Sequence, residues 1–165
     1  MDVDNLGRMI RLAEEFFDMK NDPDQLSVDR ESRALLSAIH PATMSEERDE
    51  NGPIAWILVI PTVHALMEAF IRGEINVREL LDRTLPGGVY DALYLCSALV
   101  LPEHRGKGLA RRLTSQAISA IRHDHPLRSL FYWSFSGAGD TLAASVAGEF
   151  DLPLYRREAA PSSLI

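Results

Sequence analysis

Hydrophobic residues recur at three- and four-residue spacing in the first part of the chain, which predicts helices with one buried face. One such stripe covers residues 4–20 and a second covers residues 28–39. Because proline cannot continue a helix, we expect the second helix to end before Pro41. Residues 1–45 are therefore predicted to form a helical N-terminal part, and the charged stretch 45–52 to form a solvated loop.

The pattern changes at residues 54–60, where the continuous apolar run IAWILVI predicts a strand covered on both faces. The helical period returns over residues 62–84 as two short helices. We expect Thr62 to cap the first of them, and Asn76 with Glu79 to form a capping box for the second. The middle of the chain thus predicts a strand followed by two helices.

Strands and helices alternate in the remainder of the chain. The expected elements are a strand over 89–101, a helix over 105–122, a strand over 130–135, a helix over 140–148 and a strand over 152–157. This order predicts a mixed fold of the α/β (α+β) class. No linker interrupts it, so we expect a single domain over residues 1–165 with its core at residues 54–157.

Composition narrows the class of protein. A chain of 165 residues, 46% of them hydrophobic, is long enough to bury a core. A net charge of −7 argues against a nucleic-acid binder, which needs a basic surface, and the apolar runs are too short to cross a membrane. The N-terminus has no signal-peptide pattern and the single Cys96 suits a reducing compartment, so we expect a cytoplasmic protein.

The stretch VLPEHRGKGLARRL at residues 100–113 places Gly106 and Gly108 inside an otherwise good helix opening. Glycine in a helix costs roughly 0.5–1 kcal/mol relative to alanine, which suggests that a ligand approaches the backbone closely. The N–H groups of a helix N-terminus bind phosphate oxygens, and Arg105 or Lys107 would add charge. The stretch therefore predicts a phosphate or diphosphate site, with a tight structural turn as the alternative.

The same residues resemble the acyl-CoA-binding motif of the GNAT superfamily of N-acyltransferases, [QR]-x-x-G-x-[GA]. Arg105, Gly108 and Ala110 match the motif, and Pro102-Glu103 precedes it, between a predicted strand and a predicted helix. The resemblance implies a GNAT-like mixed central sheet flanked by helices. It also implies acetyl-CoA or CoA as the cosubstrate, with loop amides on the diphosphate and the preceding strand along the pantetheine arm. The implied cofactor-binding residues are Leu99, Val100, Leu101, Arg105, Gly106, Lys107, Gly108, Leu109 and Ala110.

Acyl transfer to an amine needs a base for the amine and an acid for the leaving thiolate. Bases of the family often lie on the central strand, so Asp91 is the candidate base, with a solvated turn residue as the alternative. A bulge near Leu99 to Leu101 would offer a backbone N–H to the oxyanion. Glu68 and Glu74 are expected to give the acceptor opening an acidic lip.

The chain also departs from the family pattern. In the family, the helix after the second strand of the motif often carries an asparagine and then a tyrosine that protonates the thiolate, and residues 136–150 contain neither. Tyr155 is therefore the candidate acid, with packing in the last strand as its alternative. The departure also leaves open a second function, a non-catalytic CoA-binding or interaction module. The family further has an opening strand and a hairpin before the central strand, neither of which the pattern predicts here.

The remaining expectations concern partners and metals. The resemblance implies a small-molecule or peptide amine as acceptor, and a homodimer is left open. His123, Asp124 and His125 resemble a metal cluster, but no further ligands follow at suitable spacing, so no metal is expected.

Overall fold

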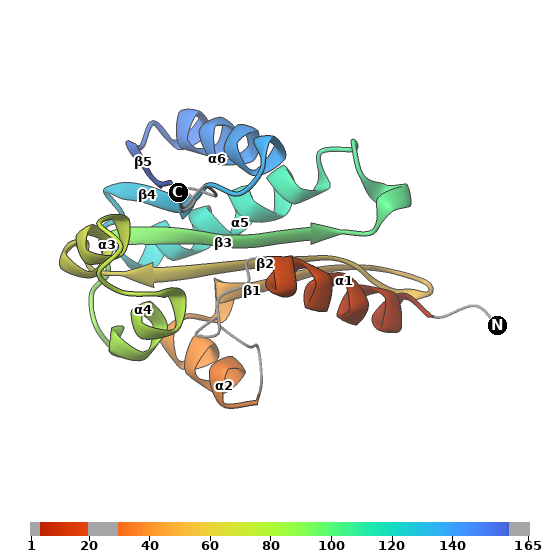
Figure 1. Ribbon diagram of the computed structural model, residues 1–165, viewed down its shortest axis with the longest axis horizontal. Helices are drawn as coiled ribbons and strands as arrows, with labels where there is room; N and C mark the ends of the chain where they lie inside the picture. The colour runs from red at the N-terminus through yellow and green to blue at the C-terminus, as the bar shows by residue number, and fades with distance from the viewer. Residues whose placement is uncertain (1–3, 20–29, 159–165) are drawn as a thin grey trace, which may run out of the picture.

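The chain forms one five-stranded sheet with the strand order β1-β2-β3-β4-β5 and helices on both faces (Figure 1). The computed structural model describes residues 4–19 and 30–158. The strands are β1 Met44–Asp49, β2 Gly52–Thr62, β3 Ala92–Val100, β4 Ser129–Trp133 and β5 Leu154–Arg157. The helices are α1 Asn5–Met19, α2 Arg30–Ile39, α3 His64–Ile71, α4 Val77–Arg83, α5 Leu109–Asp124 and α6 Gly137–Phe150, with the short 3-10 turns η1 Pro41–Thr43 and η2 Pro102–His104.

The two faces of the sheet carry different helices. Helices α5 and α6 pack on one face through a buried cluster that contains Ile57, Leu93 and Leu130 of the sheet. Helices α2, α3 and α4 cover the other face around Phe70 and Tyr94. Helix α1 covers the far end of that second face, where Met9 is fully buried. In Figure 1, α6 lies above β3 and the helices α1, α2 and α4 lie below it.

Strand β3 contains a bulge in its antiparallel pairing with β2. Leu58 is opposite Ser97, whereas the next residue of β2, Val59, is opposite Leu95, so Cys96 has no opposite residue. An extra residue switches the alternation of side chains between the two faces. Accordingly Tyr94 and Cys96 lie in the cluster on the α3 face, and beyond the bulge the odd-numbered Leu99 lies on that face under α1.

Strand β3 separates from β4 halfway along its length. The two strands pair in parallel only between Ala92–Leu95 and Ser129–Tyr132. Strand β4 stays with β5, since the N–H of Ser134 donates to the carbonyl of Arg157. Residues 97–100 of β3 are thus paired with β2 on one side and have no partner in β4 on the other. The fold therefore has an open strand edge that begins beyond Leu95 and leads to the loop before α5 (Figure 1).

Most predicted elements are confirmed, including the mixed fold, the helical N-terminus and the Asn76–Glu79 capping box. Residues 1–3 and 20–29 of the predicted N-terminal part, and residues 159–165, lie outside the described residues. The predicted starts of the last two helices are each displaced by a few residues, because α5 begins at Leu109 and α6 at Gly137.

The predicted loop at residues 45–52 is wrong. Met44–Asp49 is the edge strand β1, which pairs antiparallel with β2 and forms the hairpin that the pattern did not predict. Its charged side chains are largely exposed, and the Trp56 indole N–H donates to the Glu46 carboxylate over 2.7 Å. Charged residues are common on edge strands because they oppose pairing with other chains, so the polar pattern hides the strand.

The prediction that Thr62 caps α3 is wrong. Thr62 is the last residue of β2, and its hydroxyl bonds the Thr84 hydroxyl over 2.7 Å. The N-cap position is Val63, which provides no side-chain bond. The capping hydrogen bond comes from Asp91 instead, because the N–H of His64 donates to the Asp91 carboxylate over 2.8 Å.

The C-terminal end of α5 should make stability depend on pH. The ring centroids of His125 and Tyr90 lie 4.6 Å apart, and burial, aided by nearby His40, lowers the pKa of His125 below its ordinary 6.5. The fold thus favours neutral His125, so this contribution is complete above pH 6.5 and is lost as the pH falls through the lowered pKa. We expect His125→Phe, which keeps a ring beside Tyr90, to reduce the fall in urea midpoint between about pH 7.5 and about pH 5.5.

The matched control is exposed His123, on the same helical turn. His123→Gln should leave the wild-type pH dependence of the urea midpoint. If His125→Phe loses as much stability on acidification as the wild-type protein, His125 does not cause the effect.

Candidate functional site

The loop between β3 and α5 is shaped by two glycines in the left-handed region. Gly106 has φ +77° and Gly108 has φ +74°, a conformation that other residues adopt only at a cost. A Cβ atom built on either glycine would meet no atom within 4 Å. The glycines therefore satisfy the backbone conformation, and the space beside them is open to a ligand.

The loop presents a row of unused backbone donors. Among residues 4–19 and 30–158, no acceptor takes the N–H groups from Gly106 through Arg111. The first N–H of this region that is bonded is that of Arg112, which donates to the Gly108 carbonyl over 3.0 Å. Gly108 is the N-cap of the 16-residue helix α5 and provides no side chain to the cap. Free N–H groups and the positive end of the helix dipole coincide here, the arrangement that binds phosphate.

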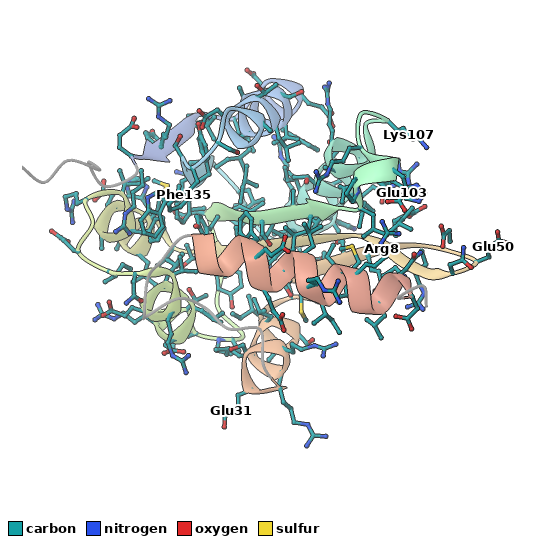
Figure 2. All side chains as sticks on the ribbon, turned by 45° about the vertical axis from the view of Figure 1, so that its right-hand side comes forward. Arg8, Glu31, Glu50, Glu103, Lys107 and Phe135 are labelled. Carbon is teal, nitrogen blue, oxygen red and sulfur yellow. The ribbon has the colours of Figure 1, made fainter. Side chains whose placement is uncertain are left out.

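Basic side chains surround the loop. Lys107 projects from it into solvent (Figure 2). A hollow of about 510 Å³ extends from Gly108 along α5 and is lined by Arg111, Arg112 and, from α6, Glu149. Arg111 and Arg112 pair with Glu149 and Glu47 at 3.4 Å and 3.1 Å, respectively. The arginines are more than half exposed, so they stay accessible to an anion in this hollow.

The open edge of β3 lies next to the loop, and the strand alternation decides which groups face it. The N–H of Leu101 donates to the Ile54 carbonyl of β2, so the N–H groups of Leu99 and Leu101 point to β2. The N–H groups of Ala98 and Val100 point to the open edge instead. The Val100 carbonyl already accepts from Arg105 Nε over 2.9 Å. Of the three predicted strand contacts, only Val100 thus turns a backbone donor outward.

A polar cluster lies at the point where β3 and β4 separate. Tyr132 is on the last rung of the pairing, opposite Leu95. Its hydroxyl and the Ser134 hydroxyl both donate to Asp140 Oδ1, over 2.9 Å and 2.7 Å. These two bonds, that from Ser134 first, lower the pKa of Asp140. Burial, and secondly the bond to Asp140, raise the pKa of Tyr132 above its ordinary 10.0. The cluster thus combines an ionised carboxylate with a protonated phenol.

The structure does not bring Asp91 to this site. Asp91 precedes β3, whereas the glycine loop follows the other end of this nine-residue strand, a separation of roughly 30 Å. Its carboxylate caps α3, and its carbonyl accepts from the N–H of Arg128 over 2.8 Å. The bulge expected near Leu99 to Leu101, which would offer an N–H to the oxyanion, lies instead at Cys96.

Tyr155 lies on the other face of the sheet from Tyr132. Its neighbour in register is Phe131, and its side chain is 43% exposed. Arg157, two residues on and thus on the same face, places its guanidinium 3.9 Å from the Trp133 ring centroid and 4.7 Å from that of Phe70 of α3. Alternation along LFYWSF would have placed Tyr132 and Ser134 together on one face. The sequence of this one strand does not show which face of the sheet is turned toward the glycine loop.

The other candidate residues are also placed. Glu68 and Glu74 both pair with Arg72 at the α3 end of the second face, on the side of the sheet opposite α5. The acidic lip expected at the acceptor opening stays a prediction. Asp124 bonds buried His40 over 2.7 Å. Within residues 4–19 and 30–158, no cluster of three His, Cys, Asp or Glu side chains could hold a metal ion. No helix in this part of the chain is long and apolar enough to cross a membrane.

Comparison with known proteins identifies one family. The model of the acetyltransferase (GNAT) family matches residues 11–136, which include the glycine loop and β4. No curated protein gives a significant match. The family assignment therefore rests on this one match, which covers most of the chain.

Three solved structures are similar at low identity. Naa20 of Chaetomium thermophilum, in complex with a bisubstrate analogue, is 20% identical with a TM-score of 0.38. The match covers 64% of this chain and 50% of that one, so it spans half the length of that protein. An integron cassette protein from the mobile metagenome of Cole Harbour Salt Marsh is 14% identical, covers 96% and 84% of the two chains, and has a TM-score of 0.43. An aminoglycoside antibiotic 6'-N-acetyltransferase from Acinetobacter haemolyticus, solved without ligand, is 16% identical, covers 97% and 92%, and has a TM-score of 0.40.

The position of Asp91 predicts a role in stability. Asp91→Ala removes the acceptor for the N–H of His64 and should lower the free energy of unfolding by about 1 kcal/mol. Asp91→Asn keeps an oxygen acceptor and should cost less. Urea denaturation measures both changes. If Asp91→Asn kept full stability but lost acyl transfer, Asp91 would again be the candidate base.

Proposed function

The chain belongs to the acetyltransferase (GNAT) family, and on that basis we propose that it binds acetyl-CoA or a related acyl-CoA and transfers the acyl group to an amine. The acceptor is a small-molecule or peptide amine. The observation that carries the proposal is the row of unused N–H groups from Gly106 through Arg111 at the end of an open strand edge.

The loop suits the diphosphate of CoA. A diphosphate needs several convergent donors and close approach to the backbone, and the loop offers both because the space beside Gly106 and Gly108 is open. Arg111, Arg112 and Lys107 would add positive charge around it. We assign the diphosphate to the amides of Gly106 to Ala110, and the charged remainder of the nucleotide to the hollow along α5.

The open edge of β3 suits an extended chain with amide groups, such as the pantetheine arm. The N–H groups of Ala98 and Val100 would donate to it as a neighbouring strand does in a sheet. This assignment replaces the expected backbone contacts of Leu99 and Leu101, whose N–H groups face β2. An arm laid along this edge from the loop ends near the bulge at Cys96 and the Tyr132–Ser134–Asp140 cluster.

Tyr132 is the proposed proton donor in place of Tyr155. During transfer, nitrogen gains the acyl carbon and loses a proton, while sulfur loses the acyl carbon and needs a proton. The raised pKa of Tyr132 keeps its hydroxyl protonated at neutral pH. Asp140 accepts from this hydroxyl at the separation of β3 and β4, and Ser134 donates to the same carboxylate oxygen. The base remains unassigned.

A non-catalytic CoA-binding module is the second candidate. The absence of asparagine and tyrosine from residues 136–150 favours it. Thiol release from acetyl-CoA against a panel of amines separates the two functions, because the module would bind CoA without releasing thiol. We propose a cytoplasmic location for either function, since the single cysteine, Cys96, is a buried thiol outside any disulfide.

Gly108→Ala should weaken CoA binding by about tenfold or more, measured by calorimetric titration. The added methyl group points into the open space that the diphosphate would need. Lys107→Ala should cost less, because the backbone donors remain.

Gly87→Ala is the matched control, because Gly87 has φ +82°, has the same open surroundings and lies in the turn before the other end of β3. It should carry the same backbone strain and leave CoA affinity unchanged. The diphosphate assignment fails if both variants bind CoA as the wild-type protein does, or if the wild-type protein binds none at millimolar ligand.

Tyr132→Phe should lower acyl transfer by about 10²-fold at neutral pH, with CoA affinity nearly unchanged, because the ring stays and only the proton donor is lost. Tyr155→Phe should keep full activity. Thiol release measures both variants. If Tyr132→Phe keeps wild-type turnover, or if Tyr155→Phe loses turnover, Tyr132 is not the proton donor.

A further inference from the structure

The segment that leads into the glycine loop has few ties of its own. None of the residues of η2 is buried, so this turn gains no support from the core. The residues on either side do have such support. Leu101, before the turn, belongs to the cluster around fully buried Met9, and the partly buried Leu109, after the loop, packs against that cluster. Helix α1 therefore supports the residue that leads into the turn, and Leu109 at the start of α5 packs against the same cluster.

Arg8 of α1 binds the middle of η2 directly. Its guanidinium makes two hydrogen bonds of 2.6 Å to the two carboxylate oxygens of Glu103 (Figure 2). A forked pair of this kind fixes orientation as well as distance. It lowers the pKa of Glu103 to about 2, so the carboxylate is ionised at every pH of interest.

A second polar contact joins the same turn to the β1–β2 hairpin. His104 Nε2 lies 3.6 Å from Asp49 Oδ2, and the Asn5 amide donates to Asp49 Oδ1 over 2.9 Å. The turn η2 therefore contacts the hairpin tip through His104 and Asp49, and it contacts α1 through Glu103 and Arg8. The Arg8 contact is the shorter of the two.

Arg8 also neutralises the negative charge of Glu103 near the glycine loop. Glu103 stands two residues before Arg105 and the unused amides, where a negative ligand is proposed to bind. An uncompensated carboxylate at this place would repel a diphosphate, and the Arg8 guanidinium cancels it. Arg8 and Met9 also precede residue 11, where the match to the family begins.

We propose that Arg8 is a positioning residue of the cofactor site, which holds the glycine loop in its binding shape and neutralises Glu103 beside the bound diphosphate. The proposal rests on the proposed function. It makes the N-terminal helix part of the CoA site, although no residue of α1 needs to touch the ligand.

The test compares CoA affinity in Arg8→Gln, Glu103→Gln and the double variant by calorimetric titration. Arg8→Gln leaves a bare carboxylate beside the loop and should weaken binding by about fivefold at low salt. Glu103→Gln removes the tie but leaves the positive charge of Arg8 without a carboxylate beside it, so it should cost about twofold at most. The double variant should recover most of the loss of Arg8→Gln, and about 0.5 M salt should shrink that loss.

Arg72→Gln is the matched control. Arg72 also makes two hydrogen bonds to an exposed glutamate, Glu74, but lies at the α3 end of the sheet. It should leave CoA affinity unchanged. The proposal is overturned if Arg8→Gln binds CoA as Arg72→Gln does, or if the double variant binds as weakly as Arg8→Gln, as a purely structural contact would.

A ligand-free measurement separates this proposal from the proposed function. The N–H groups of Leu101, His104 and Arg112 are bonded on either side of the loop, and their hydrogen exchange reports whether the loop is held. Arg8→Gln should speed it severalfold and Arg72→Gln should not. Absence of CoA binding in the wild-type protein would reject the proposed function, whereas unchanged exchange in Arg8→Gln would reject the holding role of Arg8.

Discussion

The separation of β3 from β4 after Leu95 is the constraint on which the rest of the site depends. A strand that loses its neighbour exposes backbone donors and acceptors that must find other partners. Here β2 satisfies one side of β3 and leaves the N–H groups of Ala98 and Val100 on the open side. The same edge leads directly to the unused amides of the glycine loop. Two sets of unsatisfied backbone groups thus lie on either side of η2, and the proposed extended, anionic cosubstrate would bind both.

Local backbone chemistry and charge support this site from two directions. The left-handed conformation of Gly106 and Gly108 turns the chain into α5 without side chains that would occupy the loop. Helix α1 holds the segment that precedes this loop, through Met9 beside Leu101 and through the Arg8–Glu103 pair. The charge balance matters because the chain is acidic, with a net charge of −7, and an anion requires a locally positive approach.

Local signals predicted much of this structure, and long-range pairing set what they missed. Helical periodicity, the capping box and the glycine motif each depend on neighbours in sequence. The capping box and the glycine loop are found where they were expected, and α5 and α6 are present with their starts displaced by a few residues. The edge strand at residues 44–49 was missed because its side chains meet solvent rather than a core. The positions of Asp91 and Tyr155 relative to the loop could not be predicted for a different reason: a sequence shows that a residue is on a strand, but not which end or face of the strand meets the site. Finding Tyr132 as a candidate acid required both the register of β4 with β3 and the position of Asp140, which the sequence does not show.

The central claim is that CoA binds along the open edge of β3 and the glycine loop. Titration of the isotope-labelled wild-type protein with CoA, followed by amide nuclear magnetic resonance, tests it most directly. We predict the largest shifts for the N–H groups of Gly106 through Arg111 and for those of Ala98 and Val100, with much smaller shifts for Leu99 and Leu101, which are bonded to β2. Absence of shifts at millimolar CoA, or shifts concentrated on residues remote from β3 and α5, would contradict the account.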